Sequence, residues 1–161
     1  MLKKQSGEPL DAAQAFRKAA DYCVSQEHCI GEVRFKMKQW GINNNLINST
    51  IDQLIDEGFI DEKRYASAFA RGKFKLFDWG KIKIANELRM KGIPSGLVSE
   101  ALNEIDEDEY KETVKSLINK KLGLNKQPSR EERSKIFNYL MGKGFETEII
   151  MKAMNNNFET E

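Results

Sequence analysis

The sequence predicts an all-α fold: an elongated, curved array of three tandem three-helix units that resemble helix-turn-helix repeats. Three glycines recur at intervals of about fifty residues, at Gly41, Gly92 and Gly144. Apolar residues flank each glycine at helical spacing, and no segment shows the sustained alternation with period two that a strand requires. An internal period of this length is typical of stacked helical units, which usually present a long concave surface.

The apolar residues around each glycine define the second and third helices of each unit. Positions eight and four before the glycine share one helical face, and positions five, six and ten after it begin another amphipathic helix. A glycine directly after a helix usually adopts the left-handed conformation, where any other side chain meets a Cβ clash. We therefore interpret the three glycines as structural turns. The aligned apolar residues are Val33, Met37, Ile42, Leu46, Ile47 and Ile51; Ile84, Leu88, Ile93, Leu97, Val98 and Leu102; and Ile136, Leu140, Phe145, Ile149, Ile150 and Met154.

A further helix precedes each pair, over residues 10–25, 61–78 and 106–122. Acidic residues at 61–62 and 106–109 stand at two of the predicted helix starts, where the helix dipole favours negative charge. The chain is therefore expected to divide into a polar tail and three repeats. The predicted boundaries are 1–9 for the tail, 10–58 for the first repeat, 59–105 for the second and 106–158 for the third.

The composition bounds the class of protein. Apolar residues make up 40% of the chain and charged residues 32%, with a formal net charge of +1, so no global charge dictates a partner. No apolar stretch approaches the roughly 20 residues of a membrane span, and the N-terminus lacks the apolar core of a secretion signal. Cys23 and Cys29 are too few for a disulfide framework and are expected to be buried or half-buried thiols. We expect a monomeric cytoplasmic protein that does not contact membranes.

Residues for catalysis are not apparent in the sequence. The single histidine, His28, adjoins Cys29 in a polar stretch, and these residues with Cys23 are too few for a structural zinc site. A histidine in a turn or on the surface is the expectation. No glycine-rich phosphate loop follows a predicted strand. We therefore expect no catalytic residues, no metal and no cofactor, and binding rather than enzymatic activity.

The segment 71–92 concentrates positive charge and aromatic residues. It holds seven Lys or Arg residues against two acids, whereas residues 93–112 hold one Lys against seven acids. Basic side chains with aromatic neighbours suit a nucleic-acid backbone or an acidic protein groove. The candidate residues for contacts with a partner or with nucleic acid are Arg64, Arg71, Lys73, Lys75, Lys81, Lys83, Arg89 and Lys91.

A structural interpretation of the same segment stands beside the functional one. Lys83, Glu87 and Lys91 are spaced four residues apart and can form surface ion pairs worth a few tenths of a kcal/mol. In this interpretation Phe77 packs in the core and Trp79 covers the junction between two helices. The local excess of positive charge favours the functional interpretation.

The central run resembles the RecX family, bacterial proteins that regulate the recombinase RecA. The resemblance is carried by GFIDEKRYASAFARGKF, WGKIKIANELRMKGI and LVSEAL, and it extends over roughly residues 12–156. An acidic pair, an aromatic-alanine step, a phenylalanine, a basic residue, a glycine four residues before an isoleucine and a Lys-Gly-Ile turn make up the pattern. These are Asp61-Glu62, Tyr65-Ala66, Phe69, Arg71, Gly80, Ile84 and Lys91-Gly92-Ile93, preceded by Glu32 to Gly41, Ile51, Leu54 and Glu57-Gly58.

The resemblance implies an all-helical, non-enzymatic regulator that binds the RecA–single-stranded DNA filament and inhibits or disassembles it. Recombination and DNA repair would be modulated in this way. The near-neutral charge of this chain differs from the family pattern and indicates that protein contacts carry more of the binding than phosphate contacts do.

Two alternatives follow from the same helical pattern. A helix-turn-helix DNA-binding regulator would recognise a duplex sequence and dimerise, but the helices after Gly41 and Gly92 are neutral to acidic, which is poor for a recognition helix. A helical protein-interaction scaffold would bind an unrelated partner and leave a recombinase unaffected.

Overall fold

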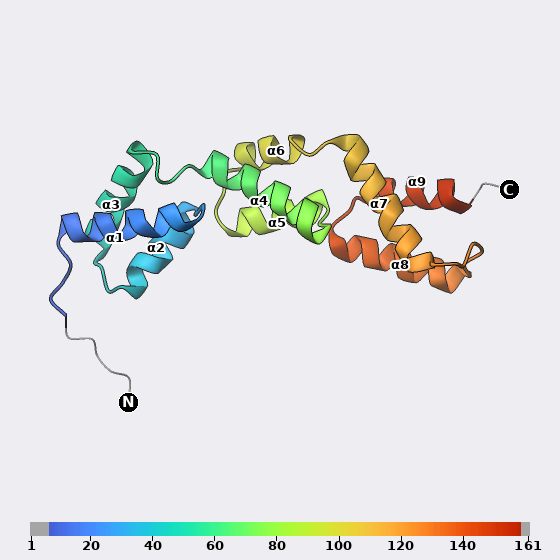
Figure 1. Ribbon diagram of the computed structural model, residues 1–161, viewed down its shortest axis with the longest axis horizontal. Coiled ribbons are helices and arrows are strands. Elements are labelled where there is room, and N and C mark those ends of the chain that lie inside the picture. Colours follow the sequence, from blue (N-terminus) through green and yellow to red (C-terminus); the bar gives the residue numbers. More distant parts are fainter. Residues whose placement is uncertain (1–6, 159–161) are drawn as a thin grey trace, which may run out of the picture. The chain divides into compact units, whose positions relative to one another are not determined.

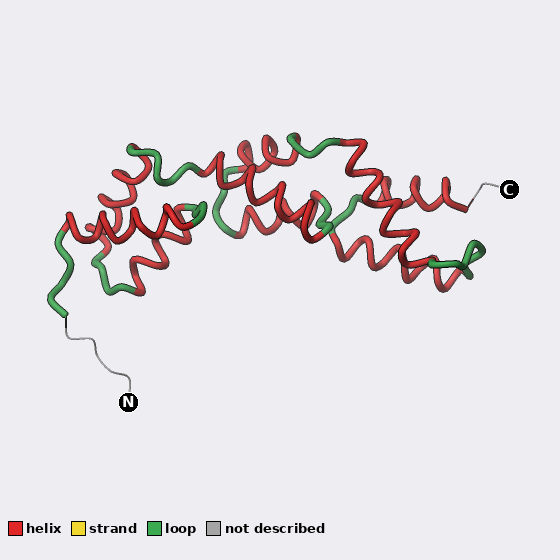
Figure 2. Tube along the Cα trace, viewed as in Figure 1, coloured by secondary structure: helices red, strands yellow, loops and turns green. Residues whose placement is uncertain are grey.

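The computed structural model describes residues 7–158, and within this range it contains nine α-helices and no strand (Figure 2). The all-α arrangement of tandem three-helix units is confirmed, whereas the elongated shape and the repeat boundaries stay predictions. Residues 1–6 of the predicted tail lie outside the described residues. The helices are α1 (Ala12–Ser25), α2 (Ile30–Gln39), α3 (Asn44–Asp56), α4 (Glu62–Phe77), α5 (Lys81–Met90), α6 (Ser95–Asn103), α7 (Glu107–Leu122), α8 (Arg130–Lys143) and α9 (Thr147–Phe158).

The chain divides into two compact units, Met1–Tyr65 and Ala66–Glu161. In the first unit, α1, α2 and α3 contact one another (Figure 1). Their apolar faces meet in one core, in which Ala15, Val33 and Leu54 have no exposed surface. This burial of one face of each helix is the main stabilising contribution, since short helices are marginal by themselves.

In the second unit, α7, α8 and α9 contact one another, and α5 contacts α6 (Figure 1). The fully buried Tyr110 of α7 connects these groups, because its ring lies 5.6 Å from that of Phe74 in α4 and 5.2 Å from that of Phe145 before α9. Aromatic rings at these separations pack favourably. The core of this unit therefore runs from α4 to α9.

The three glycine turns share one backbone geometry. Gly41, Gly92 and Gly144 have φ angles of 76°, 81° and 92°, in the left-handed region. In each turn the N–H of the residue after the glycine donates to the carbonyl four residues before it, as from Ile93 to Leu88 at 3.1 Å. This hydrogen bond brings two aligned apolar positions together, and both are buried in every repeat. The pattern of apolar columns thus has a direct cause in the turn.

The start of α5 has no side-chain cap, and other backbone groups take its place. The Gly80 N–H donates to the Lys143 carbonyl at 2.8 Å, and the Ile82 N–H donates to the Gly144 carbonyl at 3.0 Å. The Lys81 N–H between them donates to the Tyr110 hydroxyl at 2.9 Å. We call this contact the Gly80–Gly144 joint. It satisfies donors at a helix start that would otherwise lack intrahelical partners.

Candidate interaction site

The structure separates the eight predicted basic residues into two groups. Arg64, Lys75 and Lys81 form ion pairs with Glu27, Glu109 and Glu107, respectively. The hydrogen bond from Arg64 to Glu27 raises the pKa of the guanidinium. These pairs are partly exposed, so each contributes little to stability. They nevertheless neutralise part of the positive charge that the sequence concentrates here.

Lys73 and Lys83 form the second group, and they lie against aromatic rings. The Lys73 Nζ is 4.8 Å from the ring centroid of Phe77, 4.9 Å from that of Trp79 and 5.5 Å from that of Phe69. The Lys83 Nζ is 4.4 Å from the Trp79 ring. Among the described residues no carboxylate pairs with either lysine. We call these five residues the Trp79 cluster.

Local backbone geometry assembles the Trp79 cluster. Phe69, Lys73 and Phe77 are spaced four residues apart and therefore share one face of α4. After α4 the chain reverses through Asp78, whose φ of 54° is left-handed, and the Trp79 N–H donates to the Lys73 carbonyl at 3.2 Å. The turn thus places the indole beside Lys73. Phe77 is 53% exposed, so the prediction that it packs in the core is wrong.

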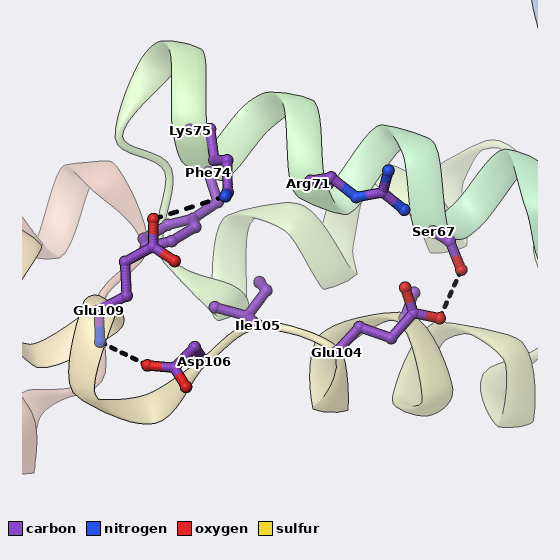
Figure 3. A pocket seen from close by; sticks show the side chains of 9 residues that line it. Ser67, Arg71, Phe74, Lys75, Glu104, Ile105, Asp106 and Glu109 are labelled. Carbon is purple, nitrogen blue, oxygen red and sulfur yellow. Dashed lines mark hydrogen bonds and ion pairs between the residues drawn. The ribbon is translucent and has the colours of Figure 1, made fainter.

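Arg71 lines a cavity of about 300 Å³ between α4 and the segment that joins α6 to α7 (Figure 3). In the same cavity the Ser67 hydroxyl donates to Glu104 at 2.7 Å, and Lys75 lies 3.7 Å from Glu109. The Arg71 guanidinium has no hydrogen bond or ion pair within the described part of the chain. It is therefore available to an anionic group of a partner.

The two remaining candidates lie on or directly after α5. Arg89 is exposed and lies 3.5 Å from Asn86, which is a weak contact. Lys91 follows the helix, with its Nζ 6.0 Å from the Phe69 ring centroid. Lys91 is thus next to the Trp79 cluster, whereas no contact of Arg89 with that cluster is described.

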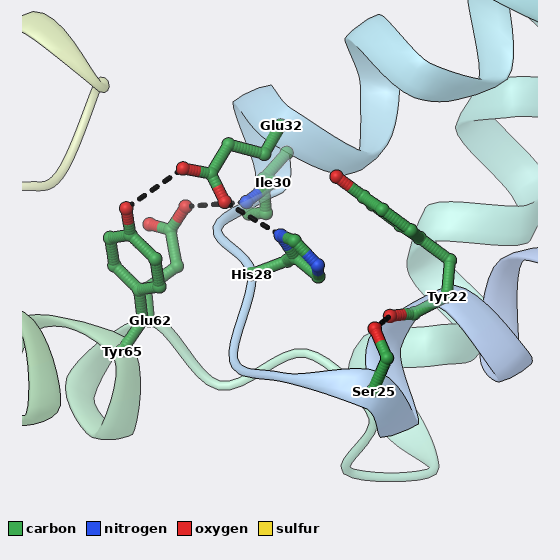
Figure 4. Close-up of polar contacts among 7 residues, drawn as sticks. All are labelled: Tyr22, Ser25, His28, Ile30, Glu32, Glu62 and Tyr65. Carbon is green, nitrogen blue, oxygen red and sulfur yellow. Dashed lines mark hydrogen bonds and ion pairs between the residues drawn. The ribbon is translucent and has the colours of Figure 1, made fainter.

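The expectation of a surface position for His28 is wrong. Its side chain is 4% exposed, stacks on Tyr22 at 3.9 Å and has its Nδ1 2.8 Å from Glu32 (Figure 4). The Glu32 carboxylate also accepts from the Tyr65 hydroxyl at 2.9 Å. Within residues 7–158 the buried Nε2 has no hydrogen-bond partner. The loop position was predicted, but the burial depends on residues from three helices.

Metal chemistry has no support in the described residues, which contain no group of three or more His, Cys, Asp or Glu side chains able to hold an ion. Cys23 and Cys29 are buried free thiols, as predicted. Burial, with a smaller contribution from Glu27, raises the pKa of Cys23 to about 11. A thiol with so high a pKa is a poor nucleophile at neutral pH. In the described range no helix is long and apolar enough to cross a membrane.

Sequence reasoning missed a second lysine–aromatic group beside the first. The Lys143 Nζ donates to the Phe77 carbonyl at 2.9 Å and lies 5.8 Å from the Tyr139 ring centroid. Lys121 lies over the same ring at 4.1 Å. A signal was present, because Lys143-Gly144 repeats the Lys91-Gly92 pair of the second repeat.

Comparisons with known proteins agree with this architecture. Residues 61–102 match the family description "RecX, second three-helix domain", and residues 107–154 match "RecX, third three-helix domain". Regulatory protein RecX of Prosthecochloris aestuarii is 27% identical over 148 residues, covering 90% of this chain and 94% of that protein. Regulatory protein RecX of Clostridium botulinum (strain Eklund 17B / Type B) is 31% identical over 133 residues, covering 80% of this chain and 62% of the relative.

A solved structure shows the same fold. The crystal structure of RecX from Lactobacillus salivarius superposes with a TM-score of 0.82 at 26% identity, covering 91% of this chain and 96% of the other. The matched regions include α4 and α5, which carry the Trp79 cluster, and α7 and α8, which carry the second lysine–aromatic group. The chain belongs to the RecX family of regulatory proteins.

Proposed function

We propose that this chain binds RecA–single-stranded DNA filaments and inhibits or disassembles them, and that it thereby modulates recombination and DNA repair. Its relatives are named regulatory proteins, which supports a regulatory role. The chain acts by binding rather than by catalysis, as a cytoplasmic monomer. The recombinase filament supplies both an extended protein surface and phosphates, so a partner of this kind suits a chain with little net charge.

The Trp79 cluster is the observation that carries the proposal. Lys73 and Lys83 have no acidic partner within the described residues, and three aromatic rings surround them. Lysine over an aromatic face is worth about 0.5–1 kcal/mol when exposed, so a partner anion can compete for the ammonium group. The cluster therefore offers two cations at fixed positions on one surface.

The remaining basic residues contribute unequally to the proposed contact. Arg71 and Arg89 are exposed, and we assign them to the partner surface together with Lys91. Lys75 and Lys81 would have to break an internal ion pair before they could bind a partner. We propose that they make a smaller contribution, and that Arg64 is held in the same way by Glu27.

The test is ATP hydrolysis by the cognate RecA on single-stranded DNA with substoichiometric amounts of the full chain. The double variant Lys73→Gln/Lys83→Gln should weaken inhibition severalfold. The matched control is Lys75→Gln/Lys81→Gln, which removes the same charge from the same two helices but from residues that are already paired. Circular dichroism should show unchanged helicity for both variants.

Two results would contradict the proposal. Wild-type chain without effect on hydrolysis would exclude the filament as partner and favour a scaffold for another protein. Equal loss of inhibition in the two double variants would leave the filament as partner but remove the special role of the Trp79 cluster. A preferred duplex sequence in a binding selection would favour a DNA-binding regulator instead.

A further inference from the structure

A second lysine–aromatic group continues the Trp79 cluster onto α7 and α8. It consists of Lys121, Tyr139 and Lys143, and we call it the Tyr139 cluster. The Lys143 Nζ is 2.9 Å from the Phe77 carbonyl oxygen and 5.8 Å from the Tyr139 ring centroid. One ammonium group thus lies against both clusters.

The Gly80–Gly144 joint holds the two clusters in a fixed relation. A Cβ placed on Gly80 would lie 2.2 Å from the Gly144 carbonyl carbon, and one placed on Gly144 would lie 2.3 Å from the Cβ of Lys83. The backbones that carry Lys83 and Lys143 are therefore in direct contact. Because both residues belong to the same compact unit, the clusters form one continuous surface.

Charge around Tyr139 favours an anionic partner. Tyr139, Lys121 and Lys135 line a cavity of about 300 Å³ together with Glu132. The Glu132 carboxylate is engaged at the start of α8, where it accepts from the Ser129 N–H at 2.7 Å, and this contact lowers its pKa. Lys121 and Lys143 have no ion pair among the described residues. Their positive charges are therefore not neutralised locally.

We propose that the Tyr139 cluster is a second contact site for single-stranded DNA, continuous with the Trp79 cluster. This deepens and rests on the proposed function. In the free chain a lysine covers each ring, with its Nζ 4.1 Å from Tyr139 and 4.4 Å from Trp79. A single strand replaces both halves of this contact, because its phosphate binds the ammonium and its base stacks on the exposed ring. Stacking on an aromatic side chain is sequence-tolerant, which suits a strand of any sequence.

The exchange favours the bound state by the sizes of the contacts involved. Each lysine releases a ring whose cation–π contact is weak at an exposed site, whereas each base gains a stacking contact of greater strength. Phosphate binding also releases counterions, which strengthens the complex at low salt. An acidic protein segment would engage the lysines but would leave Tyr139 and Trp79 without a stacking partner.

The experiment measures binding of fluorescein-labelled oligo(dT) to the full chain by anisotropy over a range of salt concentrations. Lys143→Gln should weaken binding and reduce the slope of log affinity against log salt by about 0.7, the value for one phosphate contact on a single strand. Lys121→Gln should act in the same way. Tyr139→Ala should weaken binding about five- to a hundredfold, and Tyr139→Phe should retain it.

A matched control is available in the first unit. Lys18 lies over the Trp40 ring with its Nζ 4.6 Å from the centroid, so Lys18→Gln removes the same kind of contact elsewhere. It should leave oligo(dT) affinity and salt slope unchanged. Thermal melts of every variant check that the fold is kept, and Tyr139→Phe covers the case in which Tyr139→Ala unfolds.

Specific results would overturn the inference. Wild-type affinity and salt slope in Lys121→Gln and Lys143→Gln, or no binding of oligo(dT) to the wild-type chain at low salt, would each do so. Loss of RecA inhibition without any loss of oligo(dT) binding would show that the Tyr139 cluster contacts protein instead. In all three cases inhibition of RecA by the wild-type chain would still decide the proposed function separately.

Discussion

Two polar clusters, one in each compact unit, are built around tyrosines at equivalent positions. Tyr65 and Tyr110 each stand four residues after an aspartate whose side chain accepts a backbone N–H at the start of its helix. Both hydroxyls donate to a carboxylate, Glu32 for the first and Glu146 for the second, at 2.9 and 2.7 Å. A common local sequence thus produces the same first contact in two repeats.

The clusters differ in the groups that complete them. In the first unit side chains do so, since His28 binds Glu32 and the Glu62 carboxylate accepts the Ile30 N–H at 3.2 Å (Figure 4). In the second unit two backbone segments bind each other directly at the Gly80–Gly144 joint. A side-chain cluster can change one residue at a time, whereas a backbone contact excludes every Cβ. The second cluster should therefore be the less tolerant of substitution.

The largest expected effect separates the three glycine turns. Gly144→Ala combines a left-handed φ penalty with a clash against Lys83, and it should lower the free energy of unfolding by about 3 kcal/mol. Gly41→Ala and Gly92→Ala have open space around the new Cβ, so only the φ penalty of about 1 kcal/mol remains. Urea unfolding of the three variants measures the difference.

Gly80→Ala is the control for the two causes. Its φ is −76°, so alanine suffers no left-handed penalty and only the clash with Gly144 acts. It should cost about 2 kcal/mol, less than Gly144→Ala and more than Gly92→Ala. Equal stability of all four variants would show that the backbone contact at the joint is not formed.

The next effect compares the tyrosine hydroxyls. Tyr110→Phe removes the acceptor of the buried Lys81 N–H and the donor to Glu146, so it should cost about 2 kcal/mol. Tyr65→Phe removes a donor to Glu32, which keeps His28 as a partner, and should cost about 1 kcal/mol. Thermal unfolding ranks the two. A larger cost for Tyr65→Phe would reverse the order of the two clusters.

Alkaline pH tests both clusters at once. Burial, followed by the hydrogen bonds to Glu32 and Glu146, raises the pKa of Tyr65 and Tyr110 above the usual value of about 10. Because the folded pKa is the higher one, this stability is complete below about pH 10 and is lost as the pH rises towards the folded pKa. Each tyrosine should account for about 1 kcal/mol of lost stability by about pH 11.

The measurement is the free energy of unfolding in urea from about pH 8 to about pH 11, where the unfolded tyrosines ionise. Each phenylalanine variant should show a shallower fall than the wild-type chain. Lysine titration affects all variants alike and therefore cancels in the comparison. Parallel pH profiles would contradict the burial of the phenol groups.

Local signals explain which parts of the structure could be predicted. The helices and the glycine turns follow from spacing within a few residues, as with Leu88, Gly92 and Ile93. The pairing of Lys81 with Glu107 could not be predicted, because it depends on how α7 packs against the start of α5. The burial of His28 and the approach of Lys143 to Phe77 have the same cause. Tertiary contacts thus decided which basic residues remain available.

The smallest expected effect concerns the loops that precede α2 and α5. Asp78 holds a left-handed φ of 54°, so Asp78→Gly removes a strained Cβ and should stabilise the chain by about 0.5 kcal/mol after the entropy cost of glycine. Gln26 has an extended φ of −165°, and Gln26→Gly should destabilise by about 0.5–1 kcal/mol because only the entropy cost applies. Chemical denaturation of the pair should show opposite signs. The same sign in both variants would mean that the turn beside Trp79 is not strained, and the difference between the two clusters would then rest on the glycine contact and Tyr110 alone.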